Sequence, residues 1–375
     1  MIGMIRSYRR AMLLFLAVML AGCGTSGGKQ SETASNKPKI VATTSVLCDL
    51  TRQLAQDSVD LTCLLEAGQD PHTYKPTPRD RKALEAADLI LYSGYNFAPK
   101  LIQLVEATRS SSPKIAVYEK AVTSPIFAAA HNHEHEQDET EAVNHHNEHE
   151  HEEEAHHNEH KHEEEAHHDE HEHEEEAHHD EHKDEDSHDR HEEDEDLVAD
   201  PHIWHDAEHG IQIVNIIDKQ LQQIAPDNAE RYRQNAATLT AELKTLDTWI
   251  QAQVETVPAA DRTLVTTHDA FRYYASAYGF SVAGALSGLS TEEKPSAGQM
   301  SELIELVETA NVPAIFAEST TNRQLIETVA RDAGVKVAEQ SLLVEGPGSA
   351  DETYQAMMVT NTCTIVVALG GSCSP

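Results

Sequence analysis

Five histidines lie outside a histidine-rich segment, at positions where metal ligands or catalytic groups are expected. They are His72, His202, His205, His209 and His268, whereas the other 20 of the chain's 25 histidines lie between residues 131 and 196. His72 and His202 each follow an Asp-Pro pair in a predicted turn. His268 directly follows the run 263–267. That run ends a predicted strand, where open α/β sheets place their ligands.

Three of these histidines suggest a zinc site. Three neutral imidazoles and one carboxylate make a tetrahedral shell that suits Zn²⁺. A single histidine is more often an ordinary core or surface residue, but His72, His202 and His268 recur in three strand-to-loop contexts and together favour a site. Spacing does not select the carboxylate, because Glu318 and Asp351 both lie in predicted loops of the second half of the chain. A metal held by both halves would clamp them together.

A zinc hydrolase is the alternative from another functional class. His205 and His209 have the helical spacing of half a zincin site, but Glu208 stands third after His205, where the zincin motif needs the glutamate immediately after the first histidine. A catalytic zinc also keeps one position open for water, whereas three histidines and a carboxylate close the shell. The sequence therefore predicts a binding protein rather than an enzyme.

The elements that must position these residues follow an α/β pattern. Short apolar runs alternate with amphipathic stretches, which is typical of parallel sheets covered by helices. The predicted strands are 39–44, 59–65, 89–92 and 115–117, followed by 263–267, 281–285, 313–317 and 335–338. Two groups of four indicate two parallel-sheet lobes, an N-terminal one over residues 39–225 and a C-terminal one over 259–375.

One long helix is predicted between the lobes, over residues 226–258. Pro226 and Asp227 open it, Asp227 and Glu230 have capping-box spacing, and Pro258 closes it. Apolar side chains recur at intervals of three and four from Tyr232 to Val257. At about 1.5 Å per residue, such a helix is a rod of roughly 45 Å. A helix of this length could run along both lobes and fix their relative positions.

The net charge of −37 is concentrated in an insert at residues 131–199. Residues 131–196 alone hold 31 acids, 3 bases and 20 histidines, and an eleven-residue repeat starts at positions 145, 156 and 167, with a degenerate fourth copy from 178. The insert has too few apolar residues to offset the entropy of ordering it, so it is predicted to be disordered without metal. A purely solubilising spacer would not require the histidines. The pairs that open the repeats are expected to capture metal weakly: His145, His146, His156, His157, His167, His168, His178 and His179.

The acidic balance also excludes classes of partner. The remaining 309 residues carry 34 acids against 25 bases, so the chain offers no basic stripe for phosphates. Nucleic-acid binding is therefore not expected.

The first residues read as a lipoprotein leader. Residues 1–22 combine basic positions with the short apolar run 11–20, as in a signal peptide, and 20–23 (LAGC) resembles the bacterial lipobox. Cys23 would be lipidated, and 23–38 would be a flexible tether. The alternative is a plain signal peptide with Cys23 incidental. Either version places the protein outside the cytoplasm, and the first anchors it to a membrane by lipid alone.

Four further cysteines permit two disulfides in such an oxidising compartment. Cys48 and Cys63 are the preferred pair, because both lie near the carboxyl ends of neighbouring predicted strands. For Cys363 and Cys373, a disulfide and buried free thiols are both open.

Motifs along the chain resemble those of the substrate-binding lipoproteins of bacterial ABC transporters for zinc and manganese. The matching segments are 70–80 (DPHTYKPTPRD), 200–204 (DPHIW), 267–271 (THDAF), 290–292 (STE), 316–318 (FAE) and 351–354 (DETY). The similarity runs from Lys39 onward, apart from the insert, and is greatest to zinc-importer proteins with a histidine-rich loop.

This resemblance implies a C-clamp of two lobes with a transported metal between them. The ligands would be His72 and His202 from the first lobe and His268 and Asp351 from the second. Manganese-type relatives usually have glutamate at the position of His268, so histidine favours zinc, with manganese or iron as alternatives. Where the family usually has leucine, this chain has His205, either an auxiliary ligand or a solvent-facing helix start. Glu318 is a second possible auxiliary ligand.

The resemblance also implies a division of labour in transport. The protein would act as a monomer and deliver Zn²⁺ to a permease powered by separate ATPase subunits, since the chain has no phosphate-cradling GxxxxGK[ST] motif. A zinc buffer or surface adhesin without a transport role shares the same binding features and remains an alternative.

Overall fold

Four parallel strands form the sheet of the first lobe in the computed structural model, which describes residues 37–129, 197–292 and 294–374. Their order is β2 (Asp60–Cys63), β1 (Lys39–Ala42), β3 (Leu89–Tyr92) and β4 (Lys114–Ala116). The predicted leader, Cys23, the tether and the weak metal-capture histidines lie outside the described residues.

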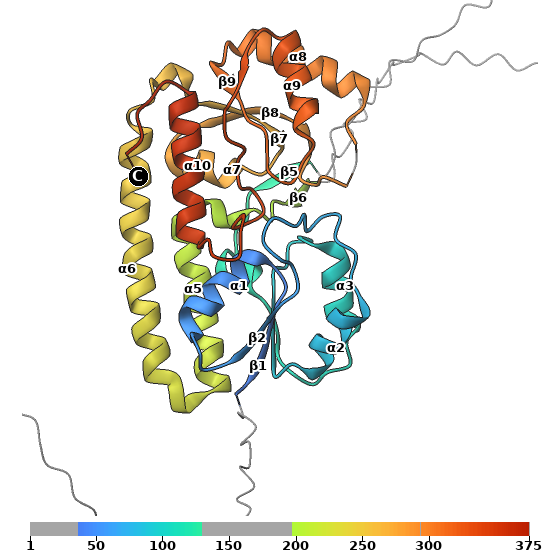
Figure 1. Ribbon diagram of the computed structural model, residues 1–375, viewed down its shortest axis with the longest axis vertical. Coiled ribbons are helices and arrows are strands. Elements are labelled where there is room, and N and C mark those ends of the chain that lie inside the picture. Colours follow the sequence, from blue (N-terminus) through green and yellow to red (C-terminus); the bar gives the residue numbers. More distant parts are fainter. Residues whose placement is uncertain (1–36, 130–196, 293, 375) are drawn as a thin grey trace, which may run out of the picture. The chain divides into compact units, whose positions relative to one another are not determined.

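Helices cover both faces of this sheet (Figure 1). Ile40 and Ala42 share a core with α1 (Ser45–Ala55) and α5 (Ala207–Ile224), while Val41 points to the other face, toward α2 (Pro78–Ala86) and α3 (Pro99–Ala107). A short helix, α4 (Val117–Ala121), follows β4. Burial on both faces explains why the strands read as short, continuous apolar runs.

The second lobe is built from two parallel strand pairs. β7 (Thr263–His268) pairs with β8 (Ser281–Ser287), and β9 (Ala314–Ile315) pairs with β10 (Lys336–Val337). The Phe316 N–H donates to the Val265 carbonyl over 2.9 Å and so joins the two pairs. The lobe also contains α7 (Arg272–Tyr278), α8 (Ala297–Ala310) and α9 (Arg323–Asp332). The last helix, α10 (Tyr354–Ala368), lies beside the long helix (Figure 1).

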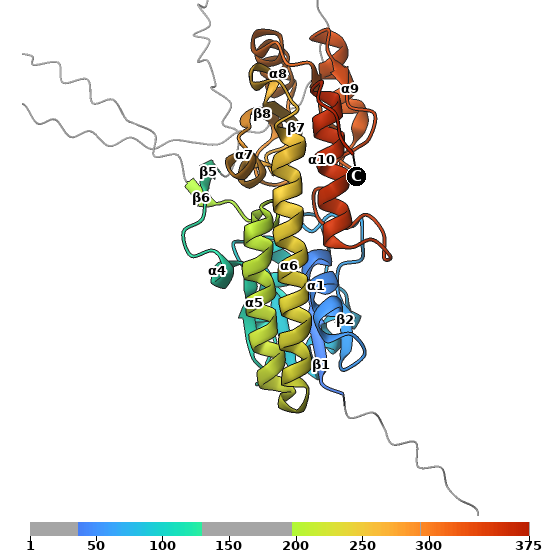
Figure 2. The ribbon, with the colours of Figure 1, turned by 90° about the vertical axis from the view of Figure 1, so that its left-hand side faces the viewer.

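The long helix is present as α6 (Ala229–Val254), after a 3-10 turn over Pro226–Asn228. It lies beside α5 and α10 and passes both lobes (Figure 2). Its stripe of buried side chains is the predicted one: Tyr232, Ala236, Leu239, Leu243, Leu246, Ile250 and Val254. These side chains belong to one apolar core that continues from α1 to α7 and α10. The predicted fold class, two α/β lobes with parallel sheets and one long helix, is confirmed.

One small element was not expected. β5 (Phe127–Ala129) and β6 (Leu197–Ala199) pair as an antiparallel ribbon at the two ends of the histidine-rich segment. Each strand has only three residues. Phe127 and Leu197 are exposed, so the ribbon lacks the alternation that identifies a strand in a sequence.

Two disulfides are formed, Cys48–Cys63 and Cys363–Cys373. The first is the preferred pair, although Cys48 lies in α1 and only Cys63 ends a strand. The second settles the open choice in favour of a disulfide. None of the helices in the described parts of the chain is long and apolar enough to cross a lipid bilayer.

Candidate metal site

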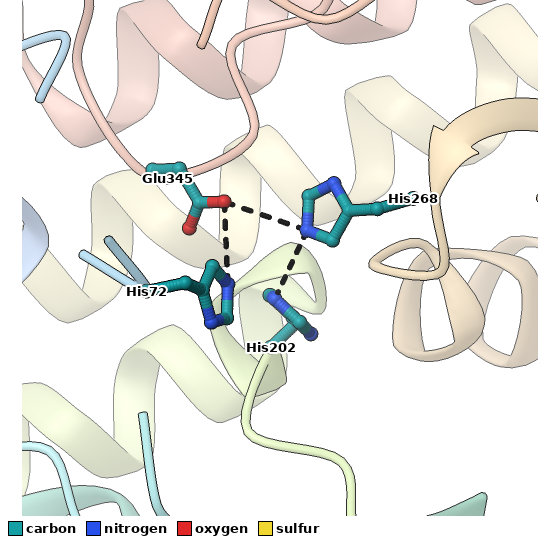
Figure 3. Close-up of side chains that lie close together, drawn as sticks. All are labelled: His72, His202, His268 and Glu345. Carbon is teal, nitrogen blue, oxygen red and sulfur yellow. Dashed lines mark hydrogen bonds and ion pairs between the residues drawn. The ribbon is translucent and has the colours of Figure 1, made fainter. Parts of the chain in front are cut away.

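Four buried side chains converge between the two lobes (Figure 3). They come from the loop after β2 (His72), the turn after β6 (His202), the end of β7 (His268) and the loop before α10 (Glu345). Each is at most 4 % exposed, and each offers one ligand atom within 4.8 Å of the other three. Among the described residues, this is the one group of histidines, cysteines and carboxylates arranged to hold a metal ion.

The repeated Asp-Pro-His sequence produces the same turn twice. In each copy the aspartate Oδ1 accepts the N–H of the histidine two residues on, Asp70 from His72 and Asp200 from His202, both over 2.9 Å. Aspartate favours such turns because its side chain can replace a backbone acceptor. The turns differ in one respect: Asp200 Oδ1 also contacts Nδ1 of the His202 ring at 2.8 Å.

His268 is positioned by a carboxylate that follows β9, the strand beside β7 in the second lobe. Glu318 follows β9, accepts the backbone N–H of His268 over 2.9 Å and lies 2.5 Å from the ring Nδ1. Glu318 is one of the predicted auxiliary ligands, but its carboxylate contacts Nδ1, on the side of the ring opposite the cluster. A carboxylate in this place fixes the ring orientation and the tautomer of a metal-binding histidine.

The distances between the converging atoms fit one tetrahedral ion. His268 Nε2 lies 3.4 Å from His202 Nε2 and 3.4 Å from Glu345 Oε1, and His72 Nε2 lies 3.5 Å from the same Oε1 (Figure 3). Zinc–ligand bonds of about 2.0 to 2.1 Å give a tetrahedron with edges of about 3.3 to 3.4 Å. Three of the six edges therefore have the length expected around zinc, and the remaining distances are at most 4.8 Å.

The hydrogen-bonding pattern leaves acceptors facing one another. With their Nδ1 protons held by Asp200 and Glu318, His202 and His268 both turn Nε2 into the cluster, where each nitrogen offers a lone pair to a metal ion once it carries no proton. His72 Nε2 and both Glu345 oxygens have no hydrogen-bond partner there, although all are buried. Unpaired buried acceptors are costly, and one metal ion bound by all four side chains would satisfy them together.

The pKa values of the shell follow from burial and close contact. Burial would raise the pKa of Glu345, but the three histidines, His72 first, lower it to about 2. Burial would likewise lower the pKa of His268, yet the charge and hydrogen bond of Glu318, helped by Glu345, raise it to about 9. For His202, burial and then the charge of His268 hold the pKa well below its ordinary value. In the metal-free shell His268 is therefore protonated at neutral pH, beside an ionised Glu345.

The carboxylate in the cluster is not the predicted Asp351. Asp351 is exposed in the turn before α10 and is not part of the cluster, whereas Glu345 occupies the carboxylate position. A signal for Glu345 was present: it directly follows the apolar run 342–344, as His268 follows 263–267. Gly346 next to it has φ of 135° and packs against Ser45, where a Cβ would lie 2.1 Å from the hydroxyl oxygen.

His205 and His209 lie outside the cluster. His205 does not face solvent: it is fully buried, stacked on Phe271 with ring centroids 4.4 Å apart, and neither ring nitrogen has a hydrogen-bond partner. Burial, followed by the charge of His202, lowers its pKa to about 3, so it is a neutral ring in an apolar position. His209 lies on α5, with Nδ1 3.7 Å from Asp206.

Replacing His205 by leucine is expected to leave Zn²⁺ affinity unchanged and to raise the free energy of unfolding by about 1 kcal/mol, because an apolar side chain removes two unsatisfied buried nitrogens. Denaturant unfolding in excess chelator and a competition titration with Zn²⁺ check the two parts. A tenfold or larger loss of affinity would reinstate His205 as an auxiliary ligand.

Comparisons with known proteins agree with this fold. Residues 40–368 match the family described as "Zinc-uptake complex component A periplasmic". The manganese-binding lipoprotein MntA of Halalkalibacterium halodurans is 28% identical over 362 residues, covering 96% of this chain and 97% of that protein. The zinc-binding protein TroA of Treponema pallidum is 28% identical over 373 residues, covering 98% and 99%. The solved structure of TroA aligns with a TM-score of 0.67 at 27% identity over 89% of this chain and 99% of TroA. The names of these relatives refer to different metals, manganese for MntA and zinc for TroA.

Proposed function

The chain belongs to the family of periplasmic zinc-uptake components, and on that premise we propose that it captures Zn²⁺ between its lobes for import. It is the periplasmic metal-binding component of an ABC metal transporter and not an enzyme. The choice of zinc and the identity of the ligands are the proposal. Permease and ATPase subunits would be separate chains, with the protein held at the membrane by a lipid on Cys23.

The observation that carries the choice of zinc is the donor set at its observed spacing. Nε2 atoms of His72, His202 and His268 and a carboxylate oxygen of Glu345 would bind the ion; three of the distances between these donors are 3.4 to 3.5 Å, and all are within 4.8 Å. Three neutral nitrogens and one oxygen at tetrahedral spacing suit Zn²⁺, whereas Mn²⁺ prefers oxygen-rich octahedral shells. The named manganese protein among the relatives makes Mn²⁺ the second candidate.

Competition calorimetry with Zn²⁺ and Mn²⁺ tests the proposal. We expect one tight Zn²⁺ site per chain and Mn²⁺ binding at least about a hundredfold weaker, because the Irving–Williams order and the donor set act in the same direction. The histidine-rich segment would add weak sites, so the titration is made on the full chain and on a chain lacking residues 131–196. The tight site should persist in both.

His268→Glu supplies the matched variant for selectivity. It replaces one nitrogen donor by oxygen, and its expected effect is a smaller ratio of Zn²⁺ to Mn²⁺ affinity. Equal affinities for Zn²⁺ and Mn²⁺ in the unsubstituted protein would favour the manganese alternative. An unchanged ratio of the two affinities in His268→Glu would mean that His268 is not a ligand.

A further inference from the structure

A cavity of about 540 Å³ opens beside the cluster, between the lobes. First-lobe residues such as Tyr95 and Pro99 line one side, and Leu289 and Ser290 of the second lobe line the other. Of the four clustered side chains, His72 is the one that reaches this cavity. A metal ion passing between solvent and the shell by this route would meet His72 first.

Two polar contacts join the lobes at this cavity. The Thr291 hydroxyl donates to Asp70 Oδ2 over 2.6 Å, and Lys100 forms an ion pair with Glu292, a lining residue of the cavity. Asp70 uses its other oxygen to hold the His72 N–H, so Thr291 is coupled through one carboxylate to the turn that carries His72. We call these two contacts the clasp.

The opposite side of the shell is held by buried contacts. The Ser45 hydroxyl donates to the Glu345 carbonyl over 3.1 Å, and the Trp204 Nε1–H donates to the Val344 carbonyl over 3.0 Å. Asp49 caps α10 by accepting the Tyr354 N–H over 2.8 Å. These contacts tie the Glu345 loop to the first lobe, and the continuous apolar core lies behind them.

The two sides of the shell therefore differ in the free energy needed to separate the lobes there. Separating the lobes on the side held by Ser45, Trp204 and Asp49 would expose apolar core and break buried hydrogen bonds. Separating them at the cavity breaks the clasp, whose ion pair is exposed: the Lys100 and Glu292 side chains are 40% and 47% accessible. Exposed ion pairs are weak and exchange readily with water.

We propose that the clasp sets the rate at which the metal ion enters and leaves the shell through this cavity. The inference rests on the proposed function, since it assumes that the four side chains bind a metal. Opening the clasp would free the His72 turn from Thr291 and give the ion its exit, while Glu345 stays attached to the first lobe.

Stopped-flow release of Zn²⁺ into excess EDTA tests the proposal on the full chain loaded with one equivalent of Zn²⁺. Trp204 is a usable fluorescence reporter, because its ring lies 5.4 Å from that of His202. Thr291→Val and Lys100→Glu are each expected to speed release about two- to tenfold, as weak polar contacts allow. The charge-swapped pair Lys100→Glu with Glu292→Lys should recover most of the original rate.

Lys244→Glu is the matched control, since Lys244 is exposed on α6 and its substitution changes the net charge by the same amount. Its release rate should equal that of the unsubstituted protein. Rates unchanged in both clasp variants, an equal acceleration in Lys244→Glu, or no recovery in the swapped pair would each overturn the clasp while leaving metal binding intact. A chain without a tight Zn²⁺ site would instead overturn the proposed function.

Discussion

Glu345→Gln is expected to lower the affinity for Zn²⁺ at least about a hundredfold, while Asp351→Asn leaves it unchanged. The Glu345 carboxylate is buried, and the surrounding histidines lower its pKa to about 2, so it is ionised throughout the neutral range. Glutamine keeps the size of the side chain but removes the negative charge of the shell. Changes around a metal that leave every ligand in place already cost tenfold to a hundredfold, so loss of a charged ligand should cost more.

The two substitutions form a matched pair, because each converts one carboxylate to an amide in the same region of the chain. A chelator competition titration gives the two affinities, and thermal unfolding in EDTA confirms that both variants fold. Glu345→Asp adds a test of reach: it keeps the charge but withdraws it by one methylene, so an intermediate affinity is expected. If Asp351→Asn abolished the site and Glu345→Gln did not, the ligand set would be the one expected from sequence resemblance.

The contrast between Glu345 and the histidines shows how far the sequence specifies this site. His72 and His202 could be predicted because the Asp-Pro-His turn is local: its hydrogen bonds join residues two positions apart. His268 could be predicted because an apolar run precedes it. Glu345 also follows a short apolar run, but it is held by Ser45, 300 positions away in the sequence, and that run does not by itself select Glu345 from the other loop carboxylates. Its role depends on tertiary contacts that sequence periodicity does not encode.

The same reasoning explains the fold. All eight predicted strands are present, because each is a short apolar run bounded by turn residues on a helix-covered sheet, although β2, β8 and β10 are only partly buried. β5 and β6 escaped prediction because their three-residue strands expose Phe127 and Leu197. His205 was misplaced for a related reason: a polar residue in a helix start suggests exposure, but here it fills an apolar position against Phe271.

Zn²⁺ affinity is expected to fall about tenfold for each unit of pH between pH 9 and pH 7, with one proton released per ion near pH 7.5. The pKa of His268 is raised to about 9, so below that value the metal must displace a proton. His202 adds no such proton, because its pKa lies well below the ordinary value, and Glu345 is already ionised. Calorimetry in buffers of different ionisation enthalpy counts the protons.

Stability of the metal-free protein should vary with pH through the same group. Because the folded pKa of His268 lies above the ordinary 6.5, the pairing of its imidazolium with Glu318 stabilises the fold fully below about pH 6.5 and is lost as pH rises through about 9. Metal binding and apo stability therefore respond to pH in opposite directions. A shell in which all three imidazoles were neutral at pH 7.5 would show neither dependence.

The substitution Glu318→Gln tests whether the proton that Zn²⁺ displaces is the one on His268. The amide oxygen can still accept the Nδ1 proton, but the charge that raises the pKa is gone, and burial then lowers the pKa of His268. Proton release near pH 7.5 should disappear and the slope between pH 7 and pH 9 should flatten, with an affinity at pH 9 reduced about tenfold through weaker ligand basicity. Glu339→Gln makes the same charge change at an exposed position and should keep the original slope. An unaltered slope in Glu318→Gln would mean that the displaced proton comes from another group.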